Sequence, residues 1–385
     1  MMKLKNIVQH SRDSITPKDY PERRYDHYSL PAYDNYMTPT IDSGDSIASN
    51  KYQVFKNSIL ISKLNPGTSR VWKIEDCNIN SISSTEFVQL NRINTQMCSL
   101  RYLYYYLRSP LITGKLKSMA SGTSGSHQRV KPKDILDLEI NLPILEEQRA
   151  IAEALSSLDD KIELLQKQNE TLEALAQTLF RQWFIEEADD SWEEYTVGRS
   201  AKIIKTSVKP EANPDKTFEH YSLPAYDNQQ NPSLDVGIDI KSNKYKVINE
   251  SVLISKLNPG TSRVWLVLDE AQENSICSTE FVVVKPDSKE WLFFIYCLLS
   301  SNDTSEYLGS CASGTSGSHQ RIKPIDVLNI NFSYNDIESI KRFGVHVQPF
   351  FEKISMNRKS IRTLEQTRDT LLPKLMSGQV RVKLD

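Results

Sequence analysis

Two long stretches of the chain carry their seam positions at alternating spacings of three and four residues. The first stretch has no glycine or proline from Leu145 to Glu187, and its seam is Leu155, Leu158, Ile162, Leu165, Asn169, Leu172, Ala176 and Leu179. The second seam is Val347, Phe350, Ile354, Asn357, Ile361, Leu364, Arg368 and Leu371. This is the heptad pattern of a coiled coil, so each stretch predicts a helix of about 40 residues, roughly 60 Å long.

The two predicted helices can be paired through their polar seam positions. An antiparallel arrangement that places Asn169 opposite Asn357 also places the small Ala176 opposite the large Phe350. A buried asparagine pair would fix the register of the two helices. In this register Arg368 faces an apolar layer, and its guanidinium is expected to reach solvent. The alternative is that each helix packs only on the globular segment next to it.

The segments before the two helices carry short apolar runs that are typical of strands. In the first segment these runs are 54–62, 70–74 and 85–90, and a helical pattern follows at 97–108. The second segment repeats this order with runs at 252–255, 263–268 and 281–284 and a helical pattern at 291–299. Because glycine- and serine-rich loops separate the runs, the fold class is α+β. The predicted divisions are 1–143 (first globular domain), 144–187 (central helix), 188–333 (second globular domain) and 334–385 (C-terminal helix).

The two globular segments also share long identical strings. His27–Asn35 returns letter for letter at His220–Asn228, Ile61–Trp72 returns at Ile254–Trp265, and Ala120–Arg129 returns at Ala312–Arg321. Two copies of one unit, each followed by a long helix, predict a pseudo-two-fold symmetric molecule that recognises something with two halves.

Composition narrows the class of protein. The 385 residues include 25% charged and 39% hydrophobic positions, and the formal net charge is −2. Five cysteines without a CxxC pair disfavour a disulfide framework or a zinc site and favour reduced thiols in the cytoplasm. No apolar run approaches the ~20 residues of a membrane span. Nor is there a phosphate-binding GxxxxGK[ST] loop, a GxGxxG turn or an HExxH motif.

The repeated glycine- and serine-rich loop is the strongest candidate for chemistry. Its hydroxyl and backbone N–H groups can hold phosphate oxygens, its glutamine can read adenine, and its arginine can read guanine or hold a phosphate. The alternative is that the loop is only a surface turn between a helix and a strand. Retention of the whole string in both copies disfavours this alternative. The candidate DNA-binding residues are Ser124, Ser126, His127, Gln128, Arg129 and Lys131 in the first copy, and Ser316, Ser318, His319, Gln320, Arg321 and Lys323 in the second.

A second candidate site is the turn around Asn65-Pro66-Gly67. Lys63 and Arg70, with their copies Lys256 and Arg263, flank this turn and could hold phosphates at a hairpin tip. A solvated hairpin with charged ends is an equally good interpretation. Trp72 and Trp265 favour a core position. Ser126 and His127 do not form a credible nucleophile and base, since adjacent residues rarely face each other and no orienting carboxylate is evident. We therefore expect no catalytic residue and no metal site.

In its order of parts and in local strings, the whole chain resembles the specificity subunit of Type I restriction–modification enzymes. Leu142–Ile151 resembles the entry into that family's central helix, Trp192–Gly198 the start of a target recognition domain, and Leu371–Val380 the family's C-terminal ending. The resemblance implies two target recognition domains, each reading one half of a split double-stranded DNA target, on two antiparallel coiled-coil helices that act as a spacer.

The resemblance also implies partners. Two modification subunits would bring S-adenosylmethionine for adenine methylation, and two optional restriction subunits would use ATP and Mg, while this chain binds no cofactor. Recognition domains of the family usually differ strongly, whereas these share long strings. Either the two half-sites are related, or the strings are scaffold and stretches such as 36–49 against 229–242 and 73–83 against 266–277 read the bases. The competing function is a stand-alone, repressor-like two-headed DNA-binding protein, which the net charge disfavours because phosphate contacts need many cations.

Overall fold

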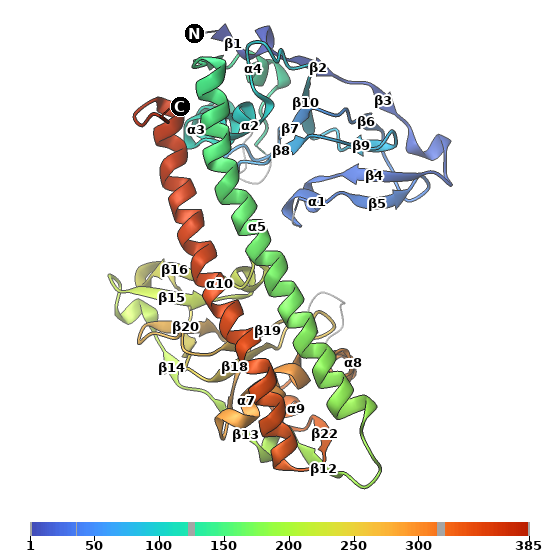
Figure 1. Ribbon diagram of the computed structural model, residues 1–385, viewed down its shortest axis with the longest axis vertical. Coiled ribbons are helices and arrows are strands. Elements are labelled where there is room, and N and C mark those ends of the chain that lie inside the picture. The colour runs from blue at the N-terminus through green and yellow to red at the C-terminus, as the bar shows by residue number, and fades with distance from the viewer. Residues whose placement is uncertain (1, 36, 122–127, 314–319, 384–385) are drawn as a thin grey trace. The chain divides into compact units, whose positions relative to one another are not determined.

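The computed structural model describes residues 2–35, 37–121, 128–313 and 320–383. The chain divides into two compact units, Met1–Lys161 with Leu364–Asp385, and Ile162–Thr363. Figure 1 shows the two long helices passing through both units. Each unit therefore contains one globular segment, part of the first long helix and part of the second.

The seam pattern correctly predicted the two long helices. They are α5 (Leu145–Arg181) and α10 (Ile337–Ser377), and α5 ends in a π-helical turn at Gln182–Glu186. In the second unit, Asn357 Nδ2 donates to Asn169 Oδ1 at 2.8 Å, and the rings of Phe180 and Phe343 lie 5.9 Å apart. As residue numbers rise along α5 they fall along α10, so the helices are antiparallel and the predicted asparagine pair is confirmed.

The expectation for Arg368 was wrong. Its side chain is only 18% exposed, and its guanidinium donates to Asp159 Oδ1 at 2.8 Å in the first unit. Asp159 directly follows Leu158, the residue that the seam places opposite Arg368. The guanidinium is thus neutralised by a carboxylate beside the seam, which is a less costly solution than an unpaired charge at a partly buried position.

The first unit contains three sheets within the described ranges. A four-stranded sheet has the order β2-β10-β7-β8, a five-stranded sheet the order β3-β6-β9-β4-β5, and β1 pairs with β11. Pairing is antiparallel except between β4 and β9. The strands are β1 (Met2–Lys3), β2 (Gln9–Ser11), β3 (Ser14–Ile15), β4 (Arg24–Tyr28), β5 (Thr40–Ser43), β6 (Lys51–Gln53), β7 (Ser58–Ser62), β8 (Val71–Ile74), β9 (Ser81–Ser83), β10 (Phe87–Asn91) and β11 (Glu139–Ile140).

The second unit repeats this topology strand for strand. Its described sheets have the orders β13-β21-β18-β19, β14-β17-β20-β15-β16 and β12-β22, with β15 and β20 parallel. The strands are β12 (Glu193–Thr196), β13 (Ala201–Ile204), β14 (Ser207–Val208), β15 (Thr217–Tyr221), β16 (Ser233–Val236), β17 (Lys244–Lys246), β18 (Ser251–Ser255), β19 (Val264–Val267), β20 (Ser275–Ser278), β21 (Phe281–Pro286) and β22 (Asn331–Tyr334).

Shorter helices join and cover these sheets. The α-helices of the first unit are α1 (Leu30–Asp34), α2 (Leu100–Arg108), α3 (Pro110–Met119) and α4 (Pro132–Leu136). Those of the second unit are α6 (Leu223–Asp227), α7 (Lys289–Leu299), α8 (Asn302–Cys311) and α9 (Pro324–Leu328). Turns of 3-10 helix lie at Leu4–Asn6, Pro17–Asp19, Val197–Arg199, Pro210–Ala212 and Gly237–Asp239. The predicted helical patterns at 97–108 and 291–299 correspond to α2 and α7.

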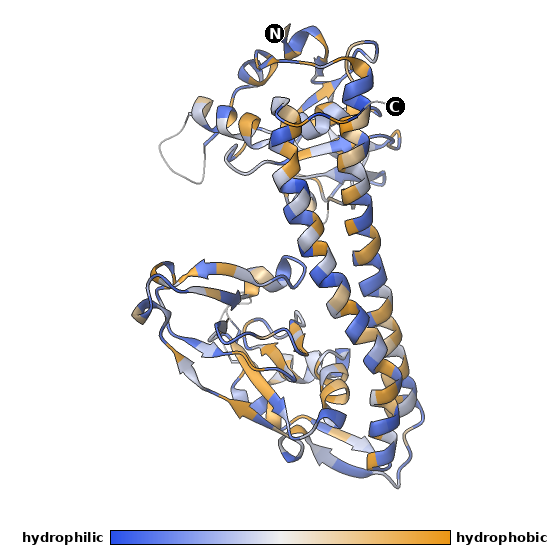
Figure 2. Cartoon of the chain, turned by 60° about the vertical axis from the view of Figure 1, so that its left-hand side comes forward, coloured by the Kyte–Doolittle hydropathy of each residue, from blue (hydrophilic) through white to orange (hydrophobic). Residues whose placement is uncertain are grey.

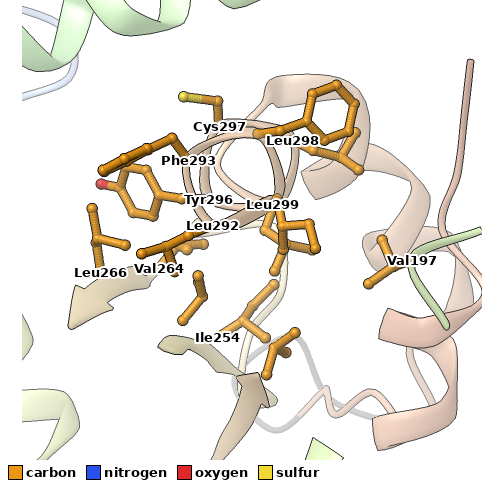
Figure 3. Packing of buried hydrophobic residues seen from close by; sticks show 14 of the residues in the cluster. Val197, Ile254, Val264, Leu266, Leu292, Phe293, Tyr296, Cys297, Leu298 and Leu299 are labelled. Atoms are coloured by element: carbon orange, nitrogen blue, oxygen red, sulfur yellow. The ribbon is translucent and has the colours of Figure 1, made fainter. Parts of the chain in front are cut away.

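The inner strands of the four-stranded sheets, β7 and β10 in the first unit and β18 and β21 in the second, are buried on both faces, which explains their unbroken apolar runs. On β18, Val252 and Ile254 pack toward α7 and the long helices, while Leu253 packs with Tyr221 and Trp265 on the other face. Figure 3 shows Leu292 and Leu299 of α7 directed toward the strands that carry Val264 and Ile254. In Figure 2 apolar residues accordingly concentrate on these strands, whereas polar and apolar residues alternate along the long helices.

Candidate nucleic-acid interface

The two loops that the sequence singled out separately lie side by side in the first unit. The backbone of Arg129 forms β-bridges with Leu64 and Ser121, and the amide of Asn65 donates to the carbonyl of Gln128 at 2.9 Å. The end of β7 and the residues that follow the glycine- and serine-rich loop therefore form one small ladder. This ladder joins the Lys63–Arg70 candidates to the Gln128–Lys131 candidates in a single site.

The repeated string at residues 27–35 packs against the hairpin that carries this ladder. Ser29 caps α1, since its hydroxyl accepts from the amide of Ala32. The helix presents Tyr33, whose hydroxyl accepts from the amide of Val71 at 3.3 Å and whose ring packs edge-on against Trp72. Trp72 is buried, as its position in the apolar run favoured. Tyr33 is thus a packing residue of the hairpin.

Arg70 does not extend from the hairpin tip as a free cation. Its Nε and Nη2 donate to the two carboxylate oxygens of Asp34 at 2.7 and 3.0 Å, and its side chain is 18% exposed. The bonds to Asp34 raise the pKa of Arg70 above its ordinary value. This bidentate pair ties the hairpin to α1, and a phosphate contact by Arg70 stays a prediction.

Arg129 also forms a bidentate pair, but in a more exposed place. Its Nε and Nη2 donate to the carboxylate of Glu86 at 3.2 and 3.1 Å, and its side chain is 56% exposed. Glu86 stands just before β10, and its carbonyl accepts from the amide of Lys63. The guanidinium is therefore held in one orientation at the surface of the ladder.

Within the described part of this site, the positive charge that forms no ion pair comes from lysines. Lys131 is exposed at the N-cap of α4, and Lys63 is partly exposed at the end of β7. Gln128 is partly exposed beside them. The remaining candidates, Ser124, Ser126, His127, Ser316, Ser318 and His319, lie outside the described residues.

The second unit reproduces the site almost bond for bond. Arg263 pairs with Asp227 at 2.7 and 3.1 Å, Arg321 pairs with Glu280 at 3.1 and 3.2 Å, and the amide of Asn258 donates to the carbonyl of Gln320 at 2.9 Å. The side chains of Arg263 and Arg321 are 19% and 52% exposed. Lys323 is exposed at the N-cap of α9, and Lys256 is partly exposed at the end of β18.

A further pair shared by the two copies joins the identical string to one residue of the variable stretch that follows it. His27 Nδ1 lies 2.7 Å from Asp42, and His220 Nδ1 lies 2.7 Å from Asp235. Burial lowers the pKa of both histidines. The pair fastens β4 to the edge strand β5 and β15 to the edge strand β16, so the two copies keep this contact although the sequences around Asp42 and Asp235 differ.

The sequence reasoning missed the four carboxylates that organise the arginines. Asp34 and Asp227 belong to a string that is repeated in full, and Glu86 and Glu280 belong to the repeated Ser-Thr-Glu-Phe-Val. Their retention in both copies was the available signal. The pairing itself is not evident from the sequence, because the acidic residue lies 36 or 43 positions from its arginine in the first copy.

The site offers directed N–H donors and lysine charge rather than a reacting group. Among the described side chains, no group of three or more His, Cys, Asp or Glu could hold a metal ion. Within the same ranges, no helix combines the length and the apolar character that crossing a bilayer requires. Fixed guanidinium forks, an amide and lysines are the groups that recognise nucleic acid.

Comparison with known proteins agrees with this chemistry. The profile of the Type I restriction modification DNA specificity domain matches residues 1–174. The chain is 31% identical over 317 residues to the Type I restriction enzyme MjaIX specificity subunit of Methanocaldococcus jannaschii, which covers 73% of this chain and 69% of that protein. It is 32% identical over 136 residues to the HindI specificity subunit of Haemophilus influenzae, covering 35% of this chain and 29% of that protein.

One solved structure shares the fold. The Type-I restriction-modification system S subunit from M. genitalium aligns with a TM-score of 0.58 at 18% sequence identity, covering 97% of this chain and 95% of that one.

Proposed function

This chain belongs to the specificity subunits of Type I restriction enzymes, and from that membership we propose that each globular domain reads one half of a bipartite DNA target. The chain is the non-catalytic DNA-recognition component of such an enzyme and assembles with its other subunits. The observation that supports two readers is the duplicated site, since both domains present the same ladder, the same lysines and the same carboxylate-held arginines.

We assign the DNA contacts to these duplicated sites. Lys63 and Lys131, with Lys256 and Lys323, supply the charge for phosphate contacts, because a flexible ammonium binds phosphate without selecting a base. We propose that directed hydrogen bonds to DNA come from Gln128, Arg129, Gln320 and Arg321. Arg70 and Arg263 act through the hairpins that they fasten. The serines and histidines at 124, 126, 127, 316, 318 and 319 remain predicted contacts on the basis of their repeated string.

We infer the composition of the assembly from the family as well. Two modification subunits bind this chain and bring S-adenosylmethionine, and two restriction subunits, where they are present, bring ATP and Mg. The complex acts in the cytoplasm, and the paired helices α5 and α10 set the spacing between the half-sites. The presence of parts of both long helices in each unit, next to one globular domain, supports a spacer role.

The direct test is methylome sequencing of cells that make the modification subunit with and without this chain. We expect a bipartite N6-methyladenine motif only when the chain is present, and a larger modification subunit should co-purify with it. The absence of any chain-dependent motif would reject the proposed function.

The two domains provide matched controls for each other. Lys131→Ala should weaken DNA binding by the complex and lower its salt dependence by about one unit of log–log slope, for all sequences alike. Lys323→Ala should do the same to a similar extent. A change in base preference from either substitution would contradict the assignment of these lysines to phosphate.

A further inference from the structure

Among the residues that the structure describes, the exposed arginine of each site is held by one edge. Glu86 occupies Nε and Nη2 of Arg129, and Glu280 occupies the same two nitrogens of Arg321. An arginine side chain has five N–H donors in a planar fork. The outer edge, formed by Nη1 and the second hydrogen of Nη2, therefore faces away from the carboxylate with two parallel donors.

The inner arginines provide the contrast within the same site. Arg70 and Arg263 are engaged by Asp34 and Asp227 through the same two nitrogens, yet their side chains are 18% and 19% exposed. The outer pair is about three times more exposed, at 56% and 52%. Only the outer arginines combine a fixed orientation with an accessible donor edge.

The carboxylate also changes what such an arginine prefers to bind. Since Glu86 is a formal counter-charge at hydrogen-bonding distance, the nonspecific attraction of Arg129 for the DNA backbone is reduced. The directional donors remain, and the fork is already oriented before DNA arrives. Two parallel N–H groups match O6 and N7 of guanine in the major groove, which is the commonest specific contact of arginine.

We propose that Arg129 and Arg321 are base-reading residues that each recognise a guanine through the outer edge of a carboxylate-held guanidinium, so that both half-sites contain a guanine read in the same way. This rests on the proposed function of the two domains as DNA readers. Glu86 and Glu280 are positioning residues that act through the arginines. The half-sites are thus related at this base and free to differ where the copies differ.

The test uses the complete complex with its modification subunits and a duplex that carries the bipartite motif. Each guanine is replaced in turn by 7-deazaguanine, which lacks the N7 acceptor and keeps the Watson–Crick face. We expect one guanine in each half-site at which this replacement weakens binding on the order of 10-fold. Arg129→Ala should abolish that sensitivity in one half-site and leave it intact in the other, and Arg321→Ala should do the converse.

Two outcomes would overturn the proposal. One is a bipartite motif in which a half-site has no guanine, which would leave the proposed function standing. The other is an Arg129→Ala complex that binds all duplexes more weakly but keeps the full sensitivity to 7-deazaguanine, because that is the behaviour of a phosphate contact. Absence of any motif would instead reject the proposed function itself.

The positioning role has its own readout. Glu86→Gln keeps the size of the side chain but removes its charge, so Arg129 should gain general affinity for DNA and lose base preference. We expect a log–log salt slope steeper by up to about one unit and a smaller 7-deazaguanine effect in the same half-site. Glu280→Gln should act on the other half-site. An unchanged slope together with unchanged base preference would remove Glu86 from the proposal.

Discussion

Both globular domains meet the long helices through a buried apolar cluster, but the first unit adds an ion-pair network, whereas the second adds stacked aromatic rings and one acid. Asp159 of α5 accepts from Tyr105 of α2 at 2.7 Å and from Arg368 of α10 at 2.8 Å. In the second unit, Phe293 of α7 stacks on Phe351 of α10 with ring centroids 5.4 Å apart, and Tyr296 donates to Glu173 of α5 at 2.5 Å.

This divergence contrasts with the near identity of the two candidate sites. Attachment of a globular domain to the helices needs only side chains that fill the available volume and hydrogen-bond their buried polar groups, so different sets of residues can serve. At the surface site, the same bonds recur between the same residue types. This difference supports the proposal that the two sites bind a common ligand.

The largest expected effect on stability comes from a substitution that breaks the attachment of the first globular domain to the long helices. Asp159→Ala removes the acceptor shared by Tyr105 and Arg368 and leaves a partly buried guanidinium without that partner. We expect the free energy of unfolding to fall by about 3 kcal/mol, with faster hydrogen exchange in the first unit. Asp160→Ala, at an exposed neighbouring position on α5, is the control and should have little effect. Equal destabilisation of the second unit would contradict separate attachments.

A smaller effect concerns the acid of the second unit and depends on pH. Burial raises the pKa of Glu173 above its ordinary value of 4.5. Because the unfolded chain then loses this proton first, stability falls as pH rises through 4.5 and levels off only above the folded pKa. The Glu173→Gln variant has no carboxyl proton to lose at this position, so its stability should not fall in this pH range. It should be more stable than the wild type at pH 7 by about 1 kcal/mol, and this difference should vanish below pH 4.5. Chemical denaturation across pH measures the difference.

The exposed Glu170 provides the control for this measurement, since Glu170→Gln on the same helix should not change the pH profile. A Glu173→Gln variant that parallels the wild-type profile from acid to neutral pH would show that burial of this acid carries no cost.

The smallest effect on stability comes from the asparagine pair. Replacing both Asn169 and Asn357 with leucine exchanges a polar layer for an apolar one, so the free energy of unfolding should rise by roughly 0.5–1 kcal/mol. The register of α5 against α10 should become less well defined. Cysteine cross-linking between facing helix positions would detect this as additional products. A single product in the double variant would mean that the aromatic layers alone fix the register.

Much of this architecture was predictable because a long helix leaves a long, regular heptad pattern in the sequence. A seam that persists from Leu155 to Leu179 outweighs local propensities, and its single polar position identified the pairing partner correctly. Arg368 was expected to reach solvent because the seam includes only the residues that directly face each other. The partner, Asp159, flanks the seam, where charged residues of coiled coils commonly form interhelical pairs.

The five-stranded sheets were missed for the opposite reason. Their strands are short and largely polar, as in β5 (Thr40–Ser43), and such segments carry no reliable alternation. The arginine pairs of the site were hidden by distance along the chain, although the repeat preserved both partners. A residue such as Glu86 becomes interpretable only when the ladder brings it beside Arg129.

The sharing of each long helix between the two units has a consequence during synthesis on the ribosome. The second unit is contiguous from Ile162 to Thr363, whereas the core of the first unit includes Leu372, Leu375 and Met376. The apolar surface of the N-terminal domain that contacts the end of α10 therefore stays uncovered until nearly all of the chain has been translated. A premature stop after residue 363 would damage the domain made first more than the domain made last.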